Sequence, residues 1–416
     1  MGLREELQKD EYWDTVYDRL NSKSFLKADE RDELWKIVNI YREDLVNDFM
    51  SGKIDWGIPD KIAIAKNGSS KKRIVYKYGL DMRFFLGVLY RAVSALRKSE
   101  MSSTCFSYKS GVNTATAIEY LKENRNEKYK VGIKVDIHAY FNSVSEERVH
   151  ELVDKIFKGF GEGPYESIHK LMFDNKVRYK GQIITEWKSL IPGCALGSLF
   201  ANECLSDCDR EFSKYDCVYA RYSDDIIVLA ETKEELQKYL DIIMGYLNKY
   251  NLTMNPDKYT WFEPGDDVEY LGLKLSSDGT IDMSDHSKMK IKRQIHRWCR
   301  KGRMEIERDG ARFDDVARRV IKRLNNKNFK CFINHDNTFG WCMYAFGKIN
   351  TIKSLTEIDF YTRDTLRAMK TGRHNKANVR VLSDEDFKKL GWVSLVDLYM
   401  LYKQDFDYYC EIIELI

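Results

Sequence analysis

The chain has 416 residues, a formal net charge of only +3, and hydrophobic side chains at 43% of its positions. A chain of this length can bury a full core, and we expect two or three subdomains of one enzyme. No apolar run near the N-terminus has the character of a signal peptide, and no later stretch is apolar enough to span a bilayer. These observations favour a cytoplasmic protein that makes no contact with membranes.

Cysteine spacing gives little sign of a structural metal. None of the nine cysteines lies in a Cys-x-x-Cys pair. Cys204 and Cys208 lie four residues apart on a predicted helix, a spacing that also suits metal binding. Without a second pair, we interpret them as buried thiols in a reducing compartment.

The N-terminal part is predicted to form helices followed by a basic hairpin. Within residues 1–55, apolar residues recur among charges at helical spacing, and they include Leu34, Trp35, Ile37, Val38 and Tyr41. Residues 61–66 and 71–77 have the composition of two strands around a Gly-Ser turn. We therefore expect a helical extension without chemistry of its own and, after it, a two-stranded basic hairpin.

An apolar segment that ends in a carboxylate comes next. Residues 131–137 are rich in β-branched side chains and place Asp136 at the end of a predicted strand. Residues 145–190 then form an insertion. Its glycine-rich residues 159–164 predict a flexible loop and not a phosphate cradle, because no Gly-Lys-Ser/Thr sequence follows.

The most informative residues are Tyr222, Ser223, Asp224 and Asp225, which join two apolar segments of a predicted hairpin. Neighbouring carboxylates repel one another and lose hydration when they pack near a sheet. A divalent cation that prefers hard oxygen ligands, Mg²⁺ or Mn²⁺, would relieve this conflict. Taken alone, the pair also fits an ordinary solvated loop.

Asp136 changes that interpretation. If its strand pairs with the hairpin, Asp136, Asp224 and Asp225 converge on a pair of metal ions. In a two-metal site the ions lie about 4 Å apart, and one activates an attacking 3′-hydroxyl while the other stabilises the leaving pyrophosphate. The three carboxylates therefore predict nucleotidyl transfer.

The C-terminal half is predicted to be helical and locally basic. Thr232 and Glu235 form a capping box in front of a helix. The buried face of that helix is predicted to consist of Leu236, Leu240, Ile243 and Leu247. Residues 286–330 carry 16 Lys and Arg against 5 Asp and Glu, a local charge of +11 that suits phosphate binding, although a solvated helix face has the same composition. Residues 331–416 are aromatic-rich and helical, without an assignable motif.

Five motifs, in order from about residue 60 to residue 275, resemble those of reverse transcriptases. Residues 222–225 resemble the Tyr-x-Asp-Asp box, and residues 134–141 resemble the first catalytic motif. Residues 191–202 resemble the loop and helix that hold template and incoming nucleotide. Residues 252–258 resemble a palm segment that ends in a catalytic lysine, and residues 270–272 resemble the primer grip.

This resemblance implies an α+β fold, that of a right-hand polymerase with fingers, a palm of antiparallel sheet backed by helices, and a helical thumb. We expect a helical N-terminal extension at residues 1–55 and the fingers and palm at residues 56–283. The basic thumb would follow at residues 284–345, and a helical C-terminal extension at residues 346–416.

The resemblance also assigns roles to individual residues. Asp136, Asp224 and Asp225 would be catalytic and, with the carbonyl of Ile137, would hold two Mg²⁺ or Mn²⁺ ions. Lys258 would protonate the pyrophosphate, although a solvated turn lysine fits its position equally well. The nucleotide would contact Lys66, Arg73, Tyr140, Phe141 and Gly193. The nucleic acid would contact Lys109, Tyr222, Tyr270, Lys288, Lys292, Arg293, Arg297 and Arg300.

Phe141 bears on the choice of nucleotide. It lies five residues after Asp136, where RNA-dependent RNA polymerases carry an aspartate that accepts the ribose 2′-hydroxyl. A bulky aromatic side chain there blocks that hydroxyl, so we expect a preference for dNTPs. The alternative, with Phe141 in the core and Tyr140 facing the sugar, predicts the same preference.

Two positions depart from the family pattern. Pro192-Gly193 replaces the usual Gln-Gly, so the glycine is retained but the side-chain amide is absent, and we expect unusual template handling. His138 replaces a lysine or glycine, and we interpret it as exposed and not catalytic.

The layout most resembles single-gene bacterial reverse transcriptases of the unknown-group and abortive-infection class, above all the type 2 defence-associated members. We recognise no RNase H, integrase, nuclease or maturase region and no Val-Thr-Gly motif of retrons. This implies cDNA synthesis from dNTPs on a cognate noncoding RNA in antiphage defence. A retron-like or group II intron-like enzyme, an RNA-dependent RNA polymerase and an inactive nucleic-acid-binding module are the alternatives, and the oligomeric state stays open.

Overall fold

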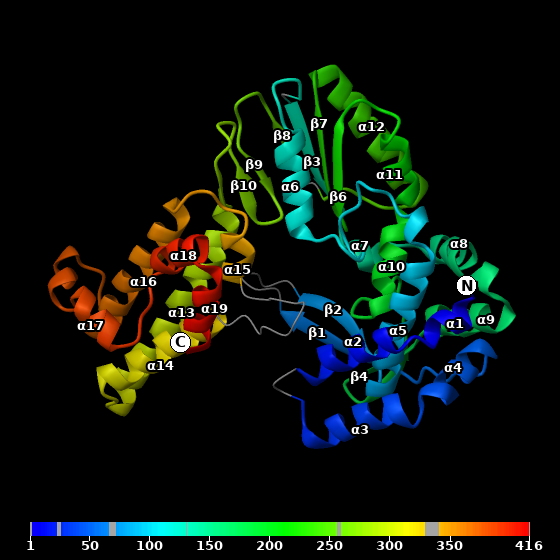
Figure 1. Cartoon of the computed structure of the whole chain (residues 1–416), viewed down its shortest axis with the longest axis horizontal. Coiled ribbons are helices and arrows are strands. Elements are labelled where there is room, and N and C mark those ends of the chain that lie inside the picture. Colours follow the sequence, from blue (N-terminus) through cyan, green and yellow to red (C-terminus); the bar gives the residue numbers. More distant parts are fainter. Residues whose placement is uncertain are drawn as a thin grey trace. The chain divides into compact units, whose positions relative to one another are not determined.

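The computed structural model describes residues 2–22, 26–65, 72–129, 131–255, 259–328 and 341–415. The chain divides into two compact units, Met1–Glu263 and Pro264–Ile416 (Figure 1). The predicted fingers-and-palm region therefore extends across a division between units, since its last strands belong to the second unit. Within the described residues, no helix is long and apolar enough to cross a membrane.

The N-terminal extension is helical, as predicted. Its helices are α1 (Leu3–Leu7), α2 (Asp10–Asn21), α3 (Ala28–Asn39) and α4 (Arg42–Met50). The first three pack on the long apolar helix α5 (Leu80–Leu96), where Trp13 lies 5.6 Å from Phe84 between ring centroids. The predicted apolar face is only partly buried, because Trp35 is 53% exposed whereas Leu34 and Ile37 are buried.

The predicted basic hairpin is confirmed as β1 (Asp60–Ala65) and β2 (Lys72–Lys77), which pair antiparallel. Two further strands, β4 (Lys176–Tyr179) and β5 (Gln182–Thr185), complete a four-stranded sheet in the order β2-β1-β4-β5. This small sheet therefore joins the hairpin to the insertion between the first two palm motifs.

The insertion is more ordered than its glycines suggested. It contains α8 (Glu146–Phe157) and α9 (Glu162–Phe173), and the loop predicted at residues 159–164 is wrong. A short 3₁₀ turn and the first turn of α9 occupy those residues. A Cβ at Gly163 would lie 2.0 Å from the carbonyl oxygen of Met50, so this glycine allows α9 to approach the end of α4.

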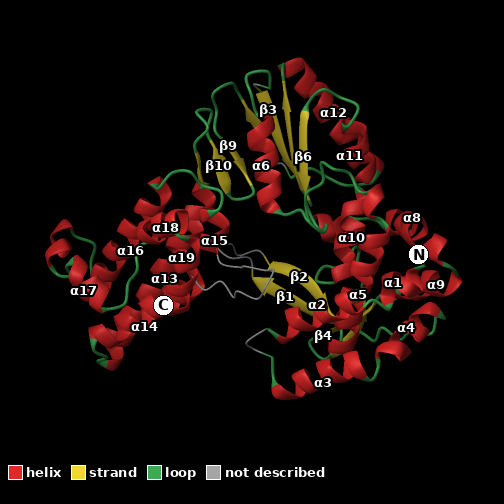
Figure 2. Ribbon diagram, viewed as in Figure 1, coloured by secondary structure: helices red, strands yellow, loops and turns green. Residues whose placement is uncertain are grey.

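The central sheet of the first unit has four antiparallel strands in the order β6-β7-β3-β8 (Figure 2). Its strands are β3 (Val131–Asp136), β6 (Val218–Tyr222), β7 (Asp225–Ala230) and β8 (Thr260–Phe262). Helix α12 (Lys233–Lys249) packs on β7 and β3, and α6 (Thr114–Asn124) packs on β6. The predicted capping box and the buried leucine–isoleucine face of α12 are both confirmed.

Short helices connect these strands on the way from β3 to β6. They are α7 (Tyr140–Ser143), α10 (Ala195–Cys204) and α11 (Ser206–Phe212). Cys204 and Cys208 lie on adjoining helices and are both buried, and burial raises the pKa of each thiol. Their burial agrees with our interpretation of them as core thiols.

The second unit combines a small sheet with a helical bundle. The sheet has the order β11-β10-β9 and consists of β9 (Val268–Tyr270), β10 (Leu273–Leu275) and β11 (Ile281–Met283). The helices are α13 (Asp285–Asp309), α14 (Phe313–Asn328), α15 (Trp341–Phe346), α16 (Lys353–Thr371), α17 (Asp384–Lys389), α18 (Leu395–Gln404) and α19 (Phe406–Leu415). Because α13 packs on both α14 and α16, the basic region and the aromatic C-terminal region share one core.

Candidate active site at the end of the central sheet

The central sheet brings the three predicted carboxylate residues to one end. Asp136, the last residue of β3, is paired with Asp225, the first residue of β7. The backbone N–H of Ile137 donates to the carbonyl oxygen of Asp224 at 3.1 Å, which holds the end of β3 against the hairpin turn. Residues 88 and 89 positions apart in sequence are therefore neighbours by strand register.

The turn itself is tight and strained. Tyr222 pairs with Asp225, which leaves Ser223 and Asp224 as a two-residue loop. Ser223 has φ of 61°, in the left-handed region that such loops normally fill with glycine. The surrounding structure must therefore hold this serine in place.

The segment at residues 252–255 is tied to the same place. Asn255 donates its backbone N–H to the carbonyl oxygen of Asp136 at 2.7 Å and its side-chain amide to Asp136 Oδ1 at 3.1 Å. His138 N–H donates to the carbonyl of Thr253 at 2.9 Å. Sequence reasoning missed Asn255, and Lys258 lies outside the described residues.

Electrostatics mark Asp225 as a strongly perturbed carboxylate. Burial raises the pKa of Asp225 to about 7, Lys134 opposes the rise, and the charges of Asp224 and Asp136 add to it. Lys134 Nζ lies 3.5 Å from Asp225 Oδ2. Sequence reasoning missed this lysine, although strand alternation places it on the same face as Asp136.

The donor chemistry of this end of the sheet fits a divalent cation. Within the described parts of the chain, no group of three or more Asp, Glu, His or Cys side chains has a geometry ready to hold a metal. The fit rests on the donor set, since Asp136 and Asp225 face one another with oxygen ligands and hold like charges close together. Lys134 supplies a positive charge at the place where a cation would relieve that repulsion.

Aromatic side chains lie in contact with one another in the segments that adjoin the carboxylates. Tyr108 lies 6.2 Å from Phe141 and 6.4 Å from Tyr222 between ring centroids. Burial raises the pKa of Tyr108, a hydrogen bond with Ser223 lowers it, the charge of Asp224 raises it, and the charge of Arg73 lowers it. The tyrosine therefore lies within electrostatic reach of both the turn and the basic hairpin.

Comparison with known proteins agrees with this geometry. A family model described as reverse transcriptase (RNA-dependent DNA polymerase) matches residues 66–275, just over half of the chain. The chain belongs to the reverse transcriptase family. Family and structure together confirm the predicted α+β polymerase fold. Members of this family use divalent metal ions, in accord with the donor set at the end of the sheet.

Solved structures similar to this reverse transcriptase include telomerases from Candida. Apo telomerase from Candida tropicalis matches with a TM-score of 0.47 and 14% identity over 83% of this chain and 63% of that one. The same enzyme truncated from its C-terminal domain matches with a TM-score of 0.45 and 16% identity over 55% of this chain and 55% of that one. Telomerase from Candida albicans in complex with a fragment of telomeric RNA matches with a TM-score of 0.44 and 14% identity over 92% of this chain and 70% of that one. A search of curated proteins found no match.

The two aromatic residues after the first catalytic motif have different surroundings. Tyr140 is 1% exposed, and its hydroxyl donates to the carbonyl of Ala201 at 2.6 Å. Its predicted contact with the nucleotide does not fit this burial. Phe141 is only partly buried, so it is the member of the pair that keeps some exposed surface.

The loop at Pro192-Gly193 lies against the basic hairpin. The carbonyl of Pro192 accepts from Tyr76 N–H at 2.8 Å. Gly193 has φ of 97°, and a Cβ there would lie 3.1 Å from the Cβ of Val75. Arg73 is exposed on the same strand, whereas Lys66 lies outside the described residues. The reverse transcriptase thus joins its hairpin to the motif that replaces Gln-Gly.

Three predicted nucleic-acid contacts are engaged within the protein instead. Lys109 donates to the carbonyl of Ser102 at 2.5 Å, and burial lowers its pKa. Lys288 and Lys292 pair with Glu357 at 3.0 and 2.5 Å. Glu357 lies more than sixty residues after the two lysines in sequence, so the local pattern did not reveal this pairing.

The remaining predicted contacts in the second unit differ in exposure. Tyr270 is fully buried and belongs to the core, which does not fit a direct contact of its side chain with a primer. Arg293, Arg297 and Arg300 are exposed on α13 and form no ion pair with the described residues. They are the basic residues of this set that remain available to phosphates.

We predict that Asp225→Asn stabilises the metal-free reverse transcriptase. A carboxyl group whose pKa is raised by folding contributes stability that is complete below its unfolded value of about 3.9 and lost as the pH rises through about 7. Asparagine cannot ionise, so the variant does not lose this stability as the pH rises. With EDTA present, the melting temperature of Asp225→Asn should exceed that of the wild type by a few degrees near pH 8, and the difference should shrink toward pH 5.

Asp216→Asn is the matched control, because it removes an exposed carboxylate that pairs with Lys128. It should give no gain in melting temperature at either pH. A gain for Asp225→Asn that does not change with pH would contradict the predicted titration.

Proposed function

We propose that this reverse transcriptase extends a primer on an RNA template, using dNTPs and two Mg²⁺ ions. The observation that carries the proposal is the pairing of Asp136 with Asp225 beside the Asp224 turn. The primer 3′-hydroxyl would attack the α-phosphate in line, and pyrophosphate would leave. Divalent cations, when bound, favour ionisation of the hydroxyl and stabilise the charge of the leaving group.

The residues of this chain would share that work. Asp136, Asp224 and Asp225 would bind the cations, together with the carbonyl of Ile137. Asn255 would orient the Asp136 carboxylate through its amide, since it already donates to Oδ1. We retain the proposal that Lys258 protonates the leaving pyrophosphate.

Selection of deoxynucleotides would depend on Phe141. Its ring lies against Tyr108 in an edge-on arrangement with an interplanar angle of 87°. A ring held in this way is rigid and has no oxygen with which to accept a ribose 2′-hydroxyl. We therefore propose that Phe141 excludes ribonucleotides by its bulk. Arg73, with Lys66, would bind the triphosphate from the hairpin side.

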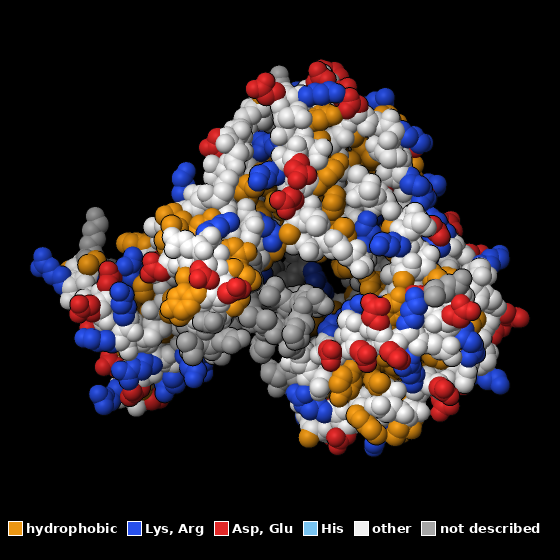
Figure 3. All heavy atoms as spheres, in the orientation of Figure 1, with side chains coloured by type: hydrophobic (Ala, Val, Ile, Leu, Met, Phe, Trp, Pro, Cys, Tyr) orange, Lys and Arg blue, Asp and Glu red, His pale blue; other side chains and the backbone are white. Residues whose placement is uncertain are grey.

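The exposed arginines of α13 would bind the nucleic-acid backbone. Arg293, Arg297 and Arg300 are spaced four and three residues apart, so they lie on one face of the helix. The opposite face packs tightly, since a Cβ at Gly302 would lie 2.9 Å from Val316 of α14. Lys and Arg side chains also gather over α14 on the face shown in Figure 3. A basic surface on a rigid helix pair suits phosphates.

We further propose that the template is a cognate noncoding RNA and that the cytoplasmic enzyme acts in antiphage defence. The support is the resemblance of the layout to the type 2 defence-associated bacterial enzymes. A dedicated template predicts that one small RNA accompanies the protein through purification.

The first test is a purification from the native locus with sequencing of any bound RNA. The same preparation is incubated with Mg²⁺ and labelled dNTPs, beside an Asp224→Ala/Asp225→Ala variant. We expect one dominant RNA and complementary DNA made only by the unaltered enzyme. A variant that loses DNA synthesis and also loses protection of cells against phage would support the defence role. Incorporation of rNTPs in preference to dNTPs would contradict the proposed polymerase class.

We predict that Phe141→Ala relaxes sugar discrimination. With the ring removed, the ratio of kcat/KM for dNTPs to that for rNTPs should fall by about tenfold or more, since one lost steric contact changes a barrier by on the order of 1.4 kcal/mol. Tyr140→Phe is the control, because it removes only a hydroxyl that is buried against Ala201. Equal effects of the two substitutions would place the selection elsewhere.

We predict that replacing Arg293, Arg297 and Arg300 by Gln weakens binding of an RNA–DNA primer-template. Each lost phosphate contact should lower the slope of log Kd against log salt by about 0.9. The measurement is fluorescence anisotropy at several salt concentrations. Lys288→Gln/Lys292→Gln serves as the control and should change the slope less, because Glu357 already pairs with both lysines.

A further inference from the structure

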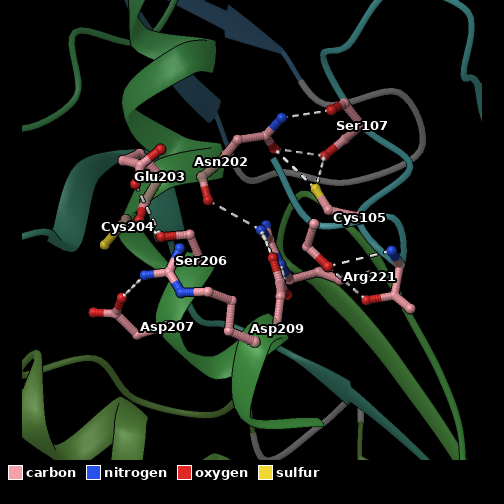
Figure 4. A network of polar contacts seen from close by, with 12 residues as sticks. Cys105, Ser107, Asn202, Glu203, Cys204, Ser206, Asp207, Asp209 and Arg221 are labelled. Atoms are coloured by element: carbon pink, nitrogen blue, oxygen red, sulfur yellow. Dashed lines mark hydrogen bonds and ion pairs between the residues drawn. The ribbon is translucent and has the colours of Figure 1, made fainter. Parts of the chain in front are cut away.

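A buried polar network supports the turn that carries Asp224 and Asp225 (Figure 4). At its centre is Arg221, the residue before Tyr222, which is 0% exposed. Its Nε and Nη2 donate to the two carboxylate oxygens of Asp209 at 2.7 and 2.6 Å. Asp209, on α11, is itself 1% exposed. A paired fork of this kind satisfies both charges away from water.

The remaining donors of Arg221 reach backbone carbonyls. Nη1 donates to the carbonyl of Ser223 at 3.1 Å, and Nη2 also donates to the carbonyl of Asn202 at 3.0 Å. The arginine therefore connects α10 and α11 to the catalytic turn. Burying a charged pair costs free energy, and a fold retains such a pair most readily where it fixes a geometry.

A second contact holds Ser223 from its other side. The hydroxyl of Ser107 accepts from the backbone N–H of Ser223 at 2.9 Å and donates to Asn202 Oδ1 at 2.8 Å. The side-chain amide of Asn202 returns a hydrogen bond to the carbonyl of Ser107. In Figure 4, Asn202 lies between Ser107 and the guanidinium of Arg221. The N–H and the C=O of Ser223 are thus both bound by buried groups.

The backbone beside the hairpin is held as well. Arg221 N–H donates to the carbonyl of Thr104 at 2.9 Å, and Phe106 N–H donates to the carbonyl of Arg221 at 2.8 Å. Residues 104–107 therefore run along β6 and deliver Ser107 to the turn. Ser107 is fully buried, so its hydroxyl has no water to replace these partners.

We propose that Ser107, Arg221 and Asp209 are positioning residues that lock the strained backbone of Ser223 and so hold the next two carboxylates ready for cations. This inference rests on the proposed polymerase function. Repulsion between Asp224, Asp225 and Asp136 drives the turn apart when no cation is bound. A left-handed serine adds strain of on the order of 1 kcal/mol. The hydrogen bonds to the N–H and the C=O of Ser223 oppose this repulsion and this strain, and the residues that make them do not contact the substrate.

Ser107→Ala tests the proposal, with Tyr219→Phe as its matched control. Tyr219 OH donates to the same Asp209 Oδ1 that Arg221 binds, at 2.7 Å, but it does not reach the turn. The first variant removes a bond to Ser223 and the second removes a bond only to the supporting aspartate. Three measurements are made on the full chain: hydrogen exchange of the peptide covering residues 222–225, Mn²⁺ affinity by electron paramagnetic resonance, and primer extension over a range of Mg²⁺ concentrations.

For Ser107→Ala we expect faster exchange at residues 222–225, weaker Mn²⁺ binding and a Mg²⁺ half-saturation raised several-fold. The kcat should fall by about tenfold, as for other small misplacements of reacting groups. The Kd for primer-template should not change, because no phosphate contact is lost. Tyr219→Phe should leave the exchange, the Mn²⁺ affinity and the Mg²⁺ dependence unchanged.

Two results would overturn the proposal: unchanged exchange and metal affinity in Ser107→Ala, or equal changes in both variants. If Ser107→Ala does not fold, Arg221→Lys provides a second test. Lysine keeps the positive charge but cannot make the paired hydrogen bonds to Asp209. This variant should also raise the Mg²⁺ concentration needed for half-saturation. The exchange and Mn²⁺ readouts do not need catalysis. Failure of the wild type to incorporate dNTPs would therefore count against the proposed function alone.

Discussion

The pairing of β3 with β7 is the constraint on which the functional end of the first unit depends. Acidic residues directly opposite one another destabilise a sheet. Asp136 and Asp225 therefore face each other only because packing along the rest of the two strands fixes the register. Every other residue of these strands except Lys134 is buried. A shift of one residue would move each side chain to the opposite face.

Gly132 explains why the register does not slip. It lies between Leu229 of β7 and Phe262 of β8, and a Cβ there would lie 2.6 Å from the leucine and 3.2 Å from the phenylalanine. Large side chains from both neighbours fill the space above this glycine. Any other register would place a larger residue under them, so packing in the middle of the sheet imposes the like-charge pair at its end.

The polar groups around the carboxylates follow from the same constraint. Lys134 and Asn255 supply a positive charge and an amide on the side of Asp136, and the Arg221–Asp209 pair supports the turn from within the core. The two positively charged groups differ in their exposure. Lys134 is partly exposed and lies beside Asp225, whereas Arg221 is fully buried and contacts the turn only through the carbonyl of Ser223.

Much of this organisation could be predicted from local pattern. The α12 helix is amphipathic with a side-chain cap, and the ends of two apolar strands identify Asp136 and Asp225. Tyr140 could not be assigned in this way. Ala139 adopts φ of 48° before the short helix α7, in which Tyr140 is buried and Phe141 is partly buried. A propensity pattern gives no sign of a left-handed alanine, and so it does not show which of the two rings turns into the core.

Long-range partners account for the other differences. Lys288 and Lys292 have the pattern of a phosphate-binding helix, and only the fold shows that Glu357 of α16 lies against both. The glycine-rich segment before α9 has the composition of a loop. Its Gly163 instead meets the carbonyl of Met50, more than a hundred residues earlier. In each case a distant contact outweighs the local preference.

Backbone strain recurs around the carboxylates and the Pro192-Gly193 loop. Five of the eight left-handed non-glycine residues in the described parts of the chain lie in segments that border these places, and they are Tyr108, Ala139, Ser189, Ile191 and Ser223. The other three are Lys180 and Leu271, in tight turns between strands, and Asn251, which follows α12. Such strain persists only where neighbouring contacts over-determine it. For Ser189 the contact is a hydrogen bond from its hydroxyl to the carbonyl of Val144 at 3.0 Å.

The loop that replaces Gln-Gly shows how that restraint works without the missing amide. Leu190 N–H donates to the carbonyl of Phe141 at 3.3 Å, and the buried Lys188 donates to the hydroxyl of Tyr78 and the carbonyl of Leu171, each at 3.1 Å. Burial lowers the pKa of Lys188 to about 8, so the fold accepts an unfavourable charge to keep this anchor. The loop is bound to the first catalytic motif, to α9 and to the hairpin at once. A shift of any one of these elements would therefore reach Gly193 through the backbone, with no need for a side-chain amide.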